Sequence, residues 1–456
     1  MSPLTAISPV DGRYASKCES LRSIFSELGL IRRRVQVEIA WLIFLLRDSG
    51  LEQLPSITPE QVSILEDISL KFSEEDGAAV KRYEKVTNHD VKAVEYFIKE
   101  KMSNDVDLSR LVEWIHFCCT SEDINNISHA LMMKEYSENV LRPRLKGLVD
   151  ILQSVSVEAA SCPLLALTHG QAASPTTFGK EMRIFYERLK RQLNILEHTD
   201  FFAKFNGASG NFNAHVFAYP QDDWQNLAKI FIEKFNLSYQ PFSTQIESHD
   251  YISEFCDAIA RTNTILIDLC RDIWLYVSRG VLKLKVIESE IGSSTMPHKI
   301  NPIDFENAEG NFGVANALLT HFSQKLPISR LQRDLTDSTV LRSFGVAAAH
   351  TLIAHDSLAK GLQKITTNVD KCHDELEANW SVLTEAIQTV LRKHSVKDAY
   401  ERIKEATRGK MFGKIEYFNL IASVKSEIGD KDYKRLETIS PATYLGLASD
   451  LAGLPE

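Results

Sequence analysis

Three stretches in the middle of the chain repeat apolar side chains at steps of three and four. They run from Leu141 to Val155, from Met182 to Leu196 and from Phe255 to Ile273. Steps of this size place the apolar side chains on one stripe of an α-helix. A stripe that continues over several turns packs against a partner helix at a shallow crossing angle. The sequence therefore predicts a bundle of long helices in the middle of the chain.

Glycine and proline are scarce, which favours helices over many short strands. The 456 residues include 20 glycines and 14 prolines, below the usual share of each. One helix start is predicted at Thr58, as N-cap, with Pro59 in the first helical position. We predict an all-α protein with an N-terminal helical domain (1–111), a central long-helix bundle (112–364) and a C-terminal helical domain (365–456).

Charge and cysteine content exclude several classes of protein. The formal net charge of −9 argues against nonspecific binding to nucleic acid or to an anionic membrane. Seven scattered cysteines without a C-x-x-C pair are typical of reduced thiols in the cytoplasm. The N-terminal segment lacks the features of a signal peptide, and the longest apolar stretch, Val37–Leu46, is too short to span a bilayer. We expect a cytoplasmic protein.

Polar loops between the expected helices carry candidate catalytic residues. Residues 292–302 read GSSTMPHKINP and combine flexibility, hydroxyl groups and the cation of Lys299. A serine acts as a base only if its anion is stabilised, which Lys299 and backbone N–H groups could do. A solvated Ser-rich turn is the alternative. His169, in Thr168-His169-Gly170-Gln171, is a candidate general acid or base because imidazole titrates near neutral pH. A histidine with a purely structural hydrogen bond is the alternative there.

Further polar residues are ambiguous by themselves. Asp90 could orient the ring of His89 or cap a helix. Arg333 and Arg342 present planar forks that suit carboxylates and phosphates, or they belong to a charged helix face. No H-x-x-x-H pair, EF-hand loop or P-loop occurs, so neither a metal nor a cofactor is expected. The residues alone predict a helical enzyme with acid–base groups on its loops.

The segment GSSTMPHKINP resembles the signature of the fumarase/aspartase superfamily, whose members eliminate fumarate from succinyl compounds. His298, in MPHK, resembles the adenylosuccinate lyase branch, because fumarases and aspartases are expected to read MPGK and argininosuccinate lyases MPQK. The resemblance continues through SPVDGRY, TNHDVKAVEYF, CTSEDINN, THGQ, NGASGN, TQIESHDY and RDLTDSTVLR. It implies a fumarase/aspartase-like fold and elimination of fumarate from adenylosuccinate, giving AMP. It also implies the same reaction on succinyl-aminoimidazole carboxamide ribotide in de novo purine biosynthesis.

The resemblance implies roles for individual residues. Ser293 is the general base, with the adjacent Ser294 left open as the alternative, and His169 is the general acid. Glu306 orients that histidine, His89 is a second active-site histidine, and Lys299 stabilises developing negative charge. The residues implied to contact the nucleotide or the dicarboxylate are Arg13, Tyr14, Asn88, His89, Asp90, Thr120, Ser121, Gln245, Ser294, Asn301, Arg333, Ser338, Thr339, Val340, Leu341 and Arg342. Which arginine holds phosphate and which holds carboxylate stays open.

The resemblance further implies a homotetramer in which three subunits build each active site. Three other interpretations compete with it. Argininosuccinate lyase is the nearest, and His298 argues against it. A catalytically silent crystallin of the same superfamily is the second, and the presence of Ser293, His169 and Lys299 together argues against it. A nucleotide-binding module is the third, and the basic residues are too dispersed in sequence for a simple binding patch.

Overall fold

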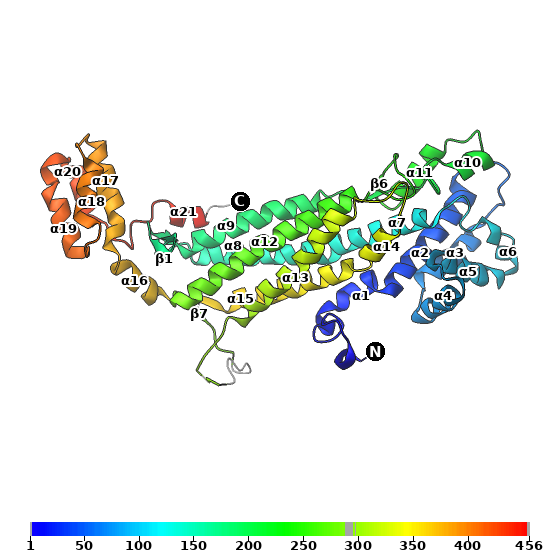
Figure 1. Cartoon of the computed structure of the whole chain (residues 1–456), viewed down its shortest axis with the longest axis horizontal. Coiled ribbons are helices and arrows are strands. Elements are labelled where there is room, and N and C mark those ends of the chain that lie inside the picture. The colour runs from blue at the N-terminus through cyan, green and yellow to red at the C-terminus, as the bar shows by residue number, and fades with distance from the viewer. Residues whose placement is uncertain (1, 288–294, 297, 454–456) are drawn as a thin grey trace. The chain divides into compact units, whose positions relative to one another are not determined.

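The computed structural model describes residues 2–287, 295–296 and 298–453. Helices dominate this part of the chain, as predicted (Figure 1). The chain forms two compact units. Unit 1 comprises Met1–Leu145, Gln192–Thr264 and Gly310–His355, and unit 2 comprises Lys146–Arg191, Ile265–Glu309 and Asp356–Glu456. Five long helices have residues in both units: α8 (Arg142–Glu158), α9 (Phe178–Glu197), α12 (Asp250–Arg279), α13 (Ile303–Lys325) and α15 (Phe344–Lys364).

Unit 1 contains the N-terminal helices and the segments that lead into the long helices. Its helices are α1 (Glu19–Phe25), α2 (Glu27–Ile43), α3 (Pro59–Leu70), α4 (Glu74–Thr87), α5 (Asp90–Ser103), α6 (Val106–Ser109), α7 (Ser121–Tyr136), α10 (Asn213–Ala218), α11 (Trp224–Glu233) and α14 (Thr336–Leu341). Two short parallel strands, β5 (Phe202–Ala203) and β6 (Ser238–Tyr239), pair with each other. A π-helical segment over Ser137–Leu141 joins α7 to α8.

Unit 2 ends in a group of short helices, as the sequence predicts for the C-terminal region. These are α16 (Val369–Glu377), α17 (Thr384–Lys393), α18 (Ala399–Thr407), α19 (Lys414–Ser423), α20 (Asp430–Thr438) and α21 (Ala448–Gly453). Figure 1 shows α17, α18, α19 and α20 packed into one group. The antiparallel strand pairs are β1 (Pro163–Leu164) with β4 (Thr176–Thr177), β2 (Leu167–Thr168) with β3 (Gln171–Ala172), and β7 (Leu282–Leu284) with β8 (Ile365–Thr367).

The apolar stripes of the long helices are buried, which confirms the periodicity seen in the sequence. Leu152 on α8, Leu189 on α9 and Leu266 on α12 are each fully buried. In unit 1 the rings of Phe255 and Phe344 stack with their centroids 6.2 Å apart, so α12 packs directly on α15. Aromatic contacts of this kind add to the stabilisation that burial alone provides.

A glycine on α15 allows a close helix approach in unit 2. A Cβ at Gly361 would lie 2.9 Å from the ring of Phe305 on α13. Real side chains do not reach this separation without displacement of the neighbour. The absence of a side chain at Gly361 therefore lets the two helices pack closely.

The predicted start of α3 is confirmed in detail. The Thr58 N–H donates to Gln61 Oε1 (2.9 Å), and the Gln61 N–H donates to Thr58 Oγ1 (3.3 Å). This reciprocal pair is a capping box, and it satisfies amide groups that the first turn leaves free. Pro59 occupies the first helical position, where its missing N–H has no cost.

Each end of the chain has its own apolar core. The N-terminal core gathers buried side chains of α2, α3, α4 and α5, with Leu65 and Phe97 among them. The C-terminal core includes Trp380 and Tyr417. Within the described residues, no helix combines the length and the hydropathy that a bilayer crossing requires. The division into domains 1–111, 112–364 and 365–456 stays a prediction.

Leucine-to-alanine substitutions on α3 test the N-terminal core. Leu65 is 0% exposed and Leu70, on the same helix, is 79% exposed. Leu65→Ala should lower the free energy of unfolding by ~2–5 kcal/mol, because it removes buried methyl groups and leaves a cavity. Leu70→Ala should change it by less than ~0.5 kcal/mol. Urea unfolding followed by circular dichroism measures both. Equal decreases in the free energy of unfolding for the two variants would contradict the packing of α3.

Candidate active site

The predicted site residues are divided between the two units. Unit 1 holds Arg13, Tyr14, Asn88, His89, Asp90, Thr120, Ser121, Gln245, Arg333, Ser338, Thr339, Val340, Leu341 and Arg342. Unit 2 holds His169, Lys299, Asn301 and Glu306. Ser293 and Ser294 lie outside the described residues.

Arg13 and Tyr14 lie in a turn near the N-terminus. The Tyr14 N–H donates to the Pro9 carbonyl (2.9 Å), and Arg13 is exposed while Tyr14 is partly buried. The ammonium of Lys17 lies 5.8 Å from the centre of the Tyr14 ring. The guanidinium of Arg13 is thus accessible to an anionic ligand.

Asn88 and His89 form the junction between α4 and α5. Asn88 adopts a left-handed conformation (φ 51°) and ends α4 with a 2.8 Å bond to the Glu84 carbonyl, a position that asparagine tolerates well. His89 caps α5, because its Nδ1 accepts the Lys92 N–H at 3.1 Å. In a neutral ring the proton therefore lies on Nε2, which is the nitrogen left for a ligand.

Asp90 is held between two arginines. Its Oδ2 accepts from Arg34 (2.7 Å) and from Arg342 (2.9 Å). Burial raises the pKa of Asp90, but Arg34 and the Val91 N–H outweigh burial, so the pKa is lowered overall. Arg34 is almost fully buried and also donates to Asn125 on α7 (2.8 Å). Asp90 thus carries a negative charge that orients Arg342, a predicted ligand-contacting residue.

Thr120 and Ser121 begin α7, and the carboxylate of Asp123 fixes them. The Thr120 N–H donates to Asp123 Oδ2 (2.8 Å). The same carboxylate accepts from Lys204 Nζ (2.8 Å), from the Asn206 N–H (3.0 Å) and from the Gly207 N–H (3.2 Å). The side chains of Asp123 and Lys204 are both 0% exposed. A buried charge is tolerated only when it is paired and hydrogen-bonded, as here.

Arg333 connects two predicted ligand-contacting segments. Its NH1 donates to Gln245 Oε1 (3.0 Å), and its NH2 pairs with Glu122 Oε2 (3.1 Å). Gln245 is further held by its own Nε2, which donates to the Ala208 carbonyl (2.9 Å). Burial raises the pKa of Glu122, and Arg333 opposes that rise. The guanidinium therefore lies between Gln245 and the first turn of α7.

Ser338, Thr339, Val340 and Leu341 lie on the short helix α14. The Ser338 N–H donates to Asp337 Oδ1 (2.7 Å), so the preceding carboxylate fixes the backbone at this point. Leu341 is 5% exposed and packs into the core. Any contact of Leu341 with a ligand would therefore be made by its backbone.

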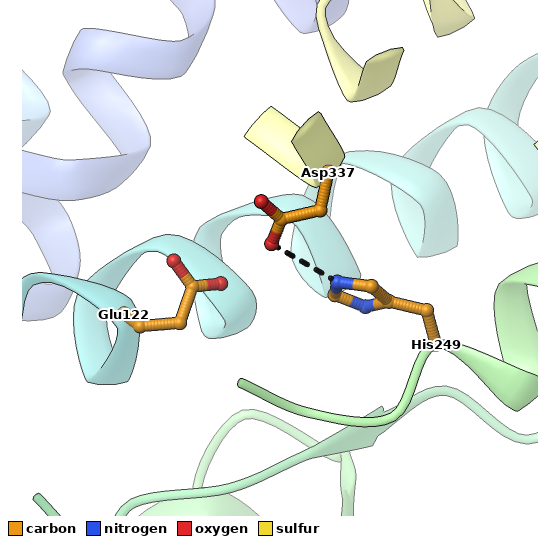
Figure 2. Close-up of side chains that lie close together, drawn as sticks. All are labelled: Glu122, His249 and Asp337. Carbon is orange, nitrogen blue, oxygen red and sulfur yellow. Dashed lines mark hydrogen bonds and ion pairs between the residues drawn. The ribbon is translucent and has the colours of Figure 1, made fainter. Parts of the chain in front are cut away.

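A buried cluster that the sequence did not predict lies beside these segments. Figure 2 shows Glu122, His249 and Asp337 with their polar atoms facing one another. One ligand-type atom from each lies within 4.8 Å of the others. His249 Nε2 is 3.4 Å from Asp337 Oδ2, and Nδ1 is 3.5 Å from Glu247 Oε2. The three residues could surround a cation, but Arg333 already pairs with Glu122.

The charge of His249 follows from its two carboxylate neighbours. Burial lowers the pKa of His249, but Asp337 and Glu247 raise it more, to about 9. The ring is therefore an imidazolium at neutral pH, whereas a metal ligand must be neutral. The position of these residues in the sequence could have indicated their role. Glu122 follows Ser121 and Asp337 precedes Ser338, while His249 is four residues after Gln245.

In unit 2, His169 occupies the tip of a tight hairpin. Strands β2 and β3 form this hairpin, and Thr168 of β2 pairs with Gln171 of β3. His169 (φ 54°) and Gly170 (φ 73°) form the two-residue turn, and both adopt the left-handed conformation that such turns require. A left-handed non-glycine residue at an exposed tip is a strained position of the kind that clusters at functional sites.

Glu306 lies in the first turn of α13, and its Oε1 accepts from Trp274 Nε1 (3.1 Å). In the described part of a single chain, no hydrogen bond or ion pair joins Glu306 to His169. Lys299 is exposed, and its backbone N–H donates to the Met296 carbonyl (3.0 Å). The pairing of Glu306 with His169 stays a prediction.

Substitution of the buried ion pair tests the support of the Thr120 segment. Lys204→Met should lower the free energy of unfolding by ~3–5 kcal/mol, because it leaves the charge of Asp123 buried without its cation. Lys71→Met is the matched control: Lys71 is 75% exposed in its pair with Asp67, and that loss should be below ~1 kcal/mol. Urea unfolding measures both. The double variant Asp123→Asn/Lys204→Met tests whether the two charges interact. If its decrease in the free energy of unfolding equals the sum of the decreases of the two single variants, the pair is not coupled.

Comparisons with known proteins agree along the whole chain. The family model described as Lyase matches residues 12–317, and the one described as Adenylosuccinate lyase C-terminal matches residues 329–445. Relatives named adenylosuccinate lyase are 49% identical in Haemophilus influenzae, 48% in Escherichia coli (strain K12) and 49% in Vibrio cholerae. The alignments cover 99%, 98% and 99% of this chain and 98%, 98% and 99% of the relatives.

Two solved structures share the fold. A 3-carboxy-cis,cis-muconate lactonizing enzyme from Pseudomonas putida has a TM-score of 0.74 at 19% identity, covering 95% of each chain. A fumarate lyase from Mesorhizobium sp. BNC1 has a TM-score of 0.77 at 16% identity, covering 95% of this chain and 96% of that one. The predicted all-α, fumarase/aspartase-like fold is confirmed. From the family models and the full-length relatives together, the chain is a lyase that belongs to the adenylosuccinate lyase family of the fumarase/aspartase superfamily.

Proposed function

We propose that this lyase eliminates fumarate from adenylosuccinate to leave AMP, and that it acts in the same way on succinyl-aminoimidazole carboxamide ribotide. The full-length match to relatives named adenylosuccinate lyase carries this assignment. The C-terminal family model of the same name supports it over argininosuccinate lyase, the nearest alternative. No cofactor is required, because the reaction is an acid–base elimination.

The reaction requires a base and an acid acting in sequence. Ser293, as its anion, takes a proton from the succinyl methylene next to the carbon that carries the purine nitrogen, and the electron pair of that C–H bond moves into the carboxylate on the methylene as an aci-carboxylate dianion. When the dianion collapses, the carbon–carbon double bond of fumarate forms and the carbon–nitrogen bond breaks. The electron pair of that bond goes to the purine N6, which receives a proton from His169. The exposed position of His169 on its hairpin suits a group that must meet a ligand.

Hydrogen-bond donors and cations held in fixed positions stabilise the dianion. Lys299 is exposed in the described chain, so its ammonium is accessible to developing negative charge. Asn301 adds an amide donor at the same loop. Arg13, Arg333 and Arg342 would hold the phosphate or the remaining carboxylate. The substrate is thus held by cations within a protein whose net charge is −9.

We further propose a homotetramer in which three subunits build each active site. Large apolar side chains are exposed on the long helices, where a neighbouring subunit would cover them. They are Val157 on α8, Ile184 on α9, Trp274 and Leu275 on α12, and Val314 on α13. Within the described part of one chain Glu306 bonds to Trp274 and not to His169, which is consistent with a Glu306–His169 pair that forms between subunits. We place the enzyme in the cytoplasm because all seven cysteines are free. A nucleic acid or membrane partner is not proposed.

An absorbance assay of adenylosuccinate loss tests the function and its residues. Wild type should convert adenylosuccinate to AMP and fumarate. His169→Ala and Ser293→Ala should each lower kcat by at least ~10²-fold, because each removes a proton-transfer group. Ser294→Ala is the matched control and should retain more activity than Ser293→Ala. Circular dichroism and light scattering confirm that each variant is folded and assembled. A folded, assembled wild type without turnover would contradict the substrate assignment.

A further inference from the structure

A buried group of charges connects three segments that carry predicted ligand-contacting residues in unit 1. Glu122 belongs to the first turn of α7, His249 precedes α12, and Asp337 lies on α14 (Figure 2). None of these three residues is itself among the predicted contacts. Their side chains are 3%, 2% and 6% exposed, so they cannot present a surface to the substrate. Any influence on the reaction must pass through the residues next to them.

His249 has a backbone conformation that indicates a specific role. Its φ is 62°, in the left-handed region that non-glycine residues adopt uncommonly. Its carbonyl accepts the N–H groups of Ile252 and Ser253 (both 3.1 Å), so it also caps α12. The strained backbone directs the ring into the buried cluster rather than toward solvent. A left-handed, buried histidine at a helix start is costly unless the ring makes strong contacts.

The ring lies between two carboxylates, one on each side. Nε2 faces Asp337 Oδ2 at 3.4 Å, and Nδ1 faces Glu247 Oε2 at 3.5 Å. Both nitrogens can donate only when the ring is protonated. Glu247 Oε2 also accepts the backbone N–H of His249 at 2.7 Å, a hydrogen bond within the same loop. The contact between Nε2 and Asp337 therefore attaches the loop of Gln245, Glu247 and His249 to α14, while Glu247 lies within ion-pair distance of the ring on the same loop.

The Asp337 carboxylate bonds to a predicted contact residue, and Glu247 lies on the same loop as another. Asp337 accepts the Ser338 N–H at 2.7 Å. Glu247 is two residues beyond Gln245, whose Oε1 accepts from Arg333. A shift of the ring would therefore move Gln245 and Ser338 relative to each other.

We propose that His249 is a positioning residue for the substrate, because its ring contacts Asp337 and so holds the loop of Gln245 against α14, which carries Ser338. This inference rests on the proposed site, in which Gln245 and Ser338 contact the substrate. His249 does not take part in proton transfer. Its loss should weaken substrate binding and leave the chemical step nearly intact.

The charge on the ring makes this positioning dependent on pH. The groups around it are Glu247 on its own loop, Asp337 on α14, Glu122 and His129 on α7, and Arg333, which pairs with Glu122. Burial, followed by the charge of Arg34, lowers the pKa of His129 to about 3, so His129 is neutral. The pKa of His249 is raised above its ordinary value of 6.5. The stability from its charge is therefore complete below pH 6.5 and is lost as the pH rises through about 9.

Steady-state kinetics of His249→Asn tests the proposal. Asparagine tolerates the left-handed backbone but cannot carry charge. KM for adenylosuccinate should rise at least ~10-fold while kcat stays within ~3-fold, the pattern expected when binding rather than chemistry is lost. Wild-type KM should rise as the pH passes about 9, and the variant should lack this rise. His350→Asn is the matched control, because His350 is 7% exposed in the same unit and bonds only to Asn311 among the described residues.

Two further variants separate failure of this inference from failure of the proposed site. If Gln245→Ala and Ser338→Ala leave KM unchanged, the site assignment is wrong. If they raise KM and His249→Asn does not, only the role of His249 is wrong. A fall in kcat with KM unchanged would also overturn the inference. If His249→Asn does not fold, the pH dependence of the wild-type KM tests the proposal instead. A KM that is constant through about pH 9 contradicts the proposal.

Discussion

The ion pair between Asp123 and Lys204 is the interaction on which the predicted site residues at the start of α7, in unit 1, depend. Both side chains are fully buried, so neither charge is stabilised by water. The carboxylate compensates by accepting from the Lys204 ammonium and from the backbone amides of Thr120, Asn206 and Gly207. One side chain thereby fixes the start of α7 against a loop more than eighty residues away.

The same principle recurs at the neighbouring segments. Arg34 is buried and orients Asp90, which in turn holds the partly exposed Arg342. Glu122 is buried and holds Arg333. In each case a buried or largely buried charge holds an arginine that is predicted to contact the ligand. Pre-oriented cations need not reorganise when an anionic substrate binds, which is how a preorganised site lowers the barrier to charge development.

Local sequence patterns predicted the helices well. They missed the buried contacts between residues that are far apart in the sequence. The stripe through Leu266 and the cap at Thr58 depend on neighbours within one or two turns, so periodicity and capping rules identify them. His249 and Asp337 are 88 residues apart, and nothing local indicates that they meet. The hairpin at His169 was predicted only as a polar loop, because its turn uses histidine where asparagine or aspartate is the usual signal. The proposed roles of the site residues came from resemblance to a family, not from spacing.

The proposal that three subunits build each active site implies that residues of one site come from different chains, and we expect this of the acid His169 and the base Ser293. Mixing inactive His169→Ala with inactive Ser293→Ala, after reversible dissociation and reassembly, tests it most directly. Hybrid tetramers with shared sites should regain activity, in about a quarter of their sites if the chains mix at random. If each site is built within one chain, every site in the mixture lacks one of the two groups. A mixture that reassembles and stays inactive would therefore contradict the proposal.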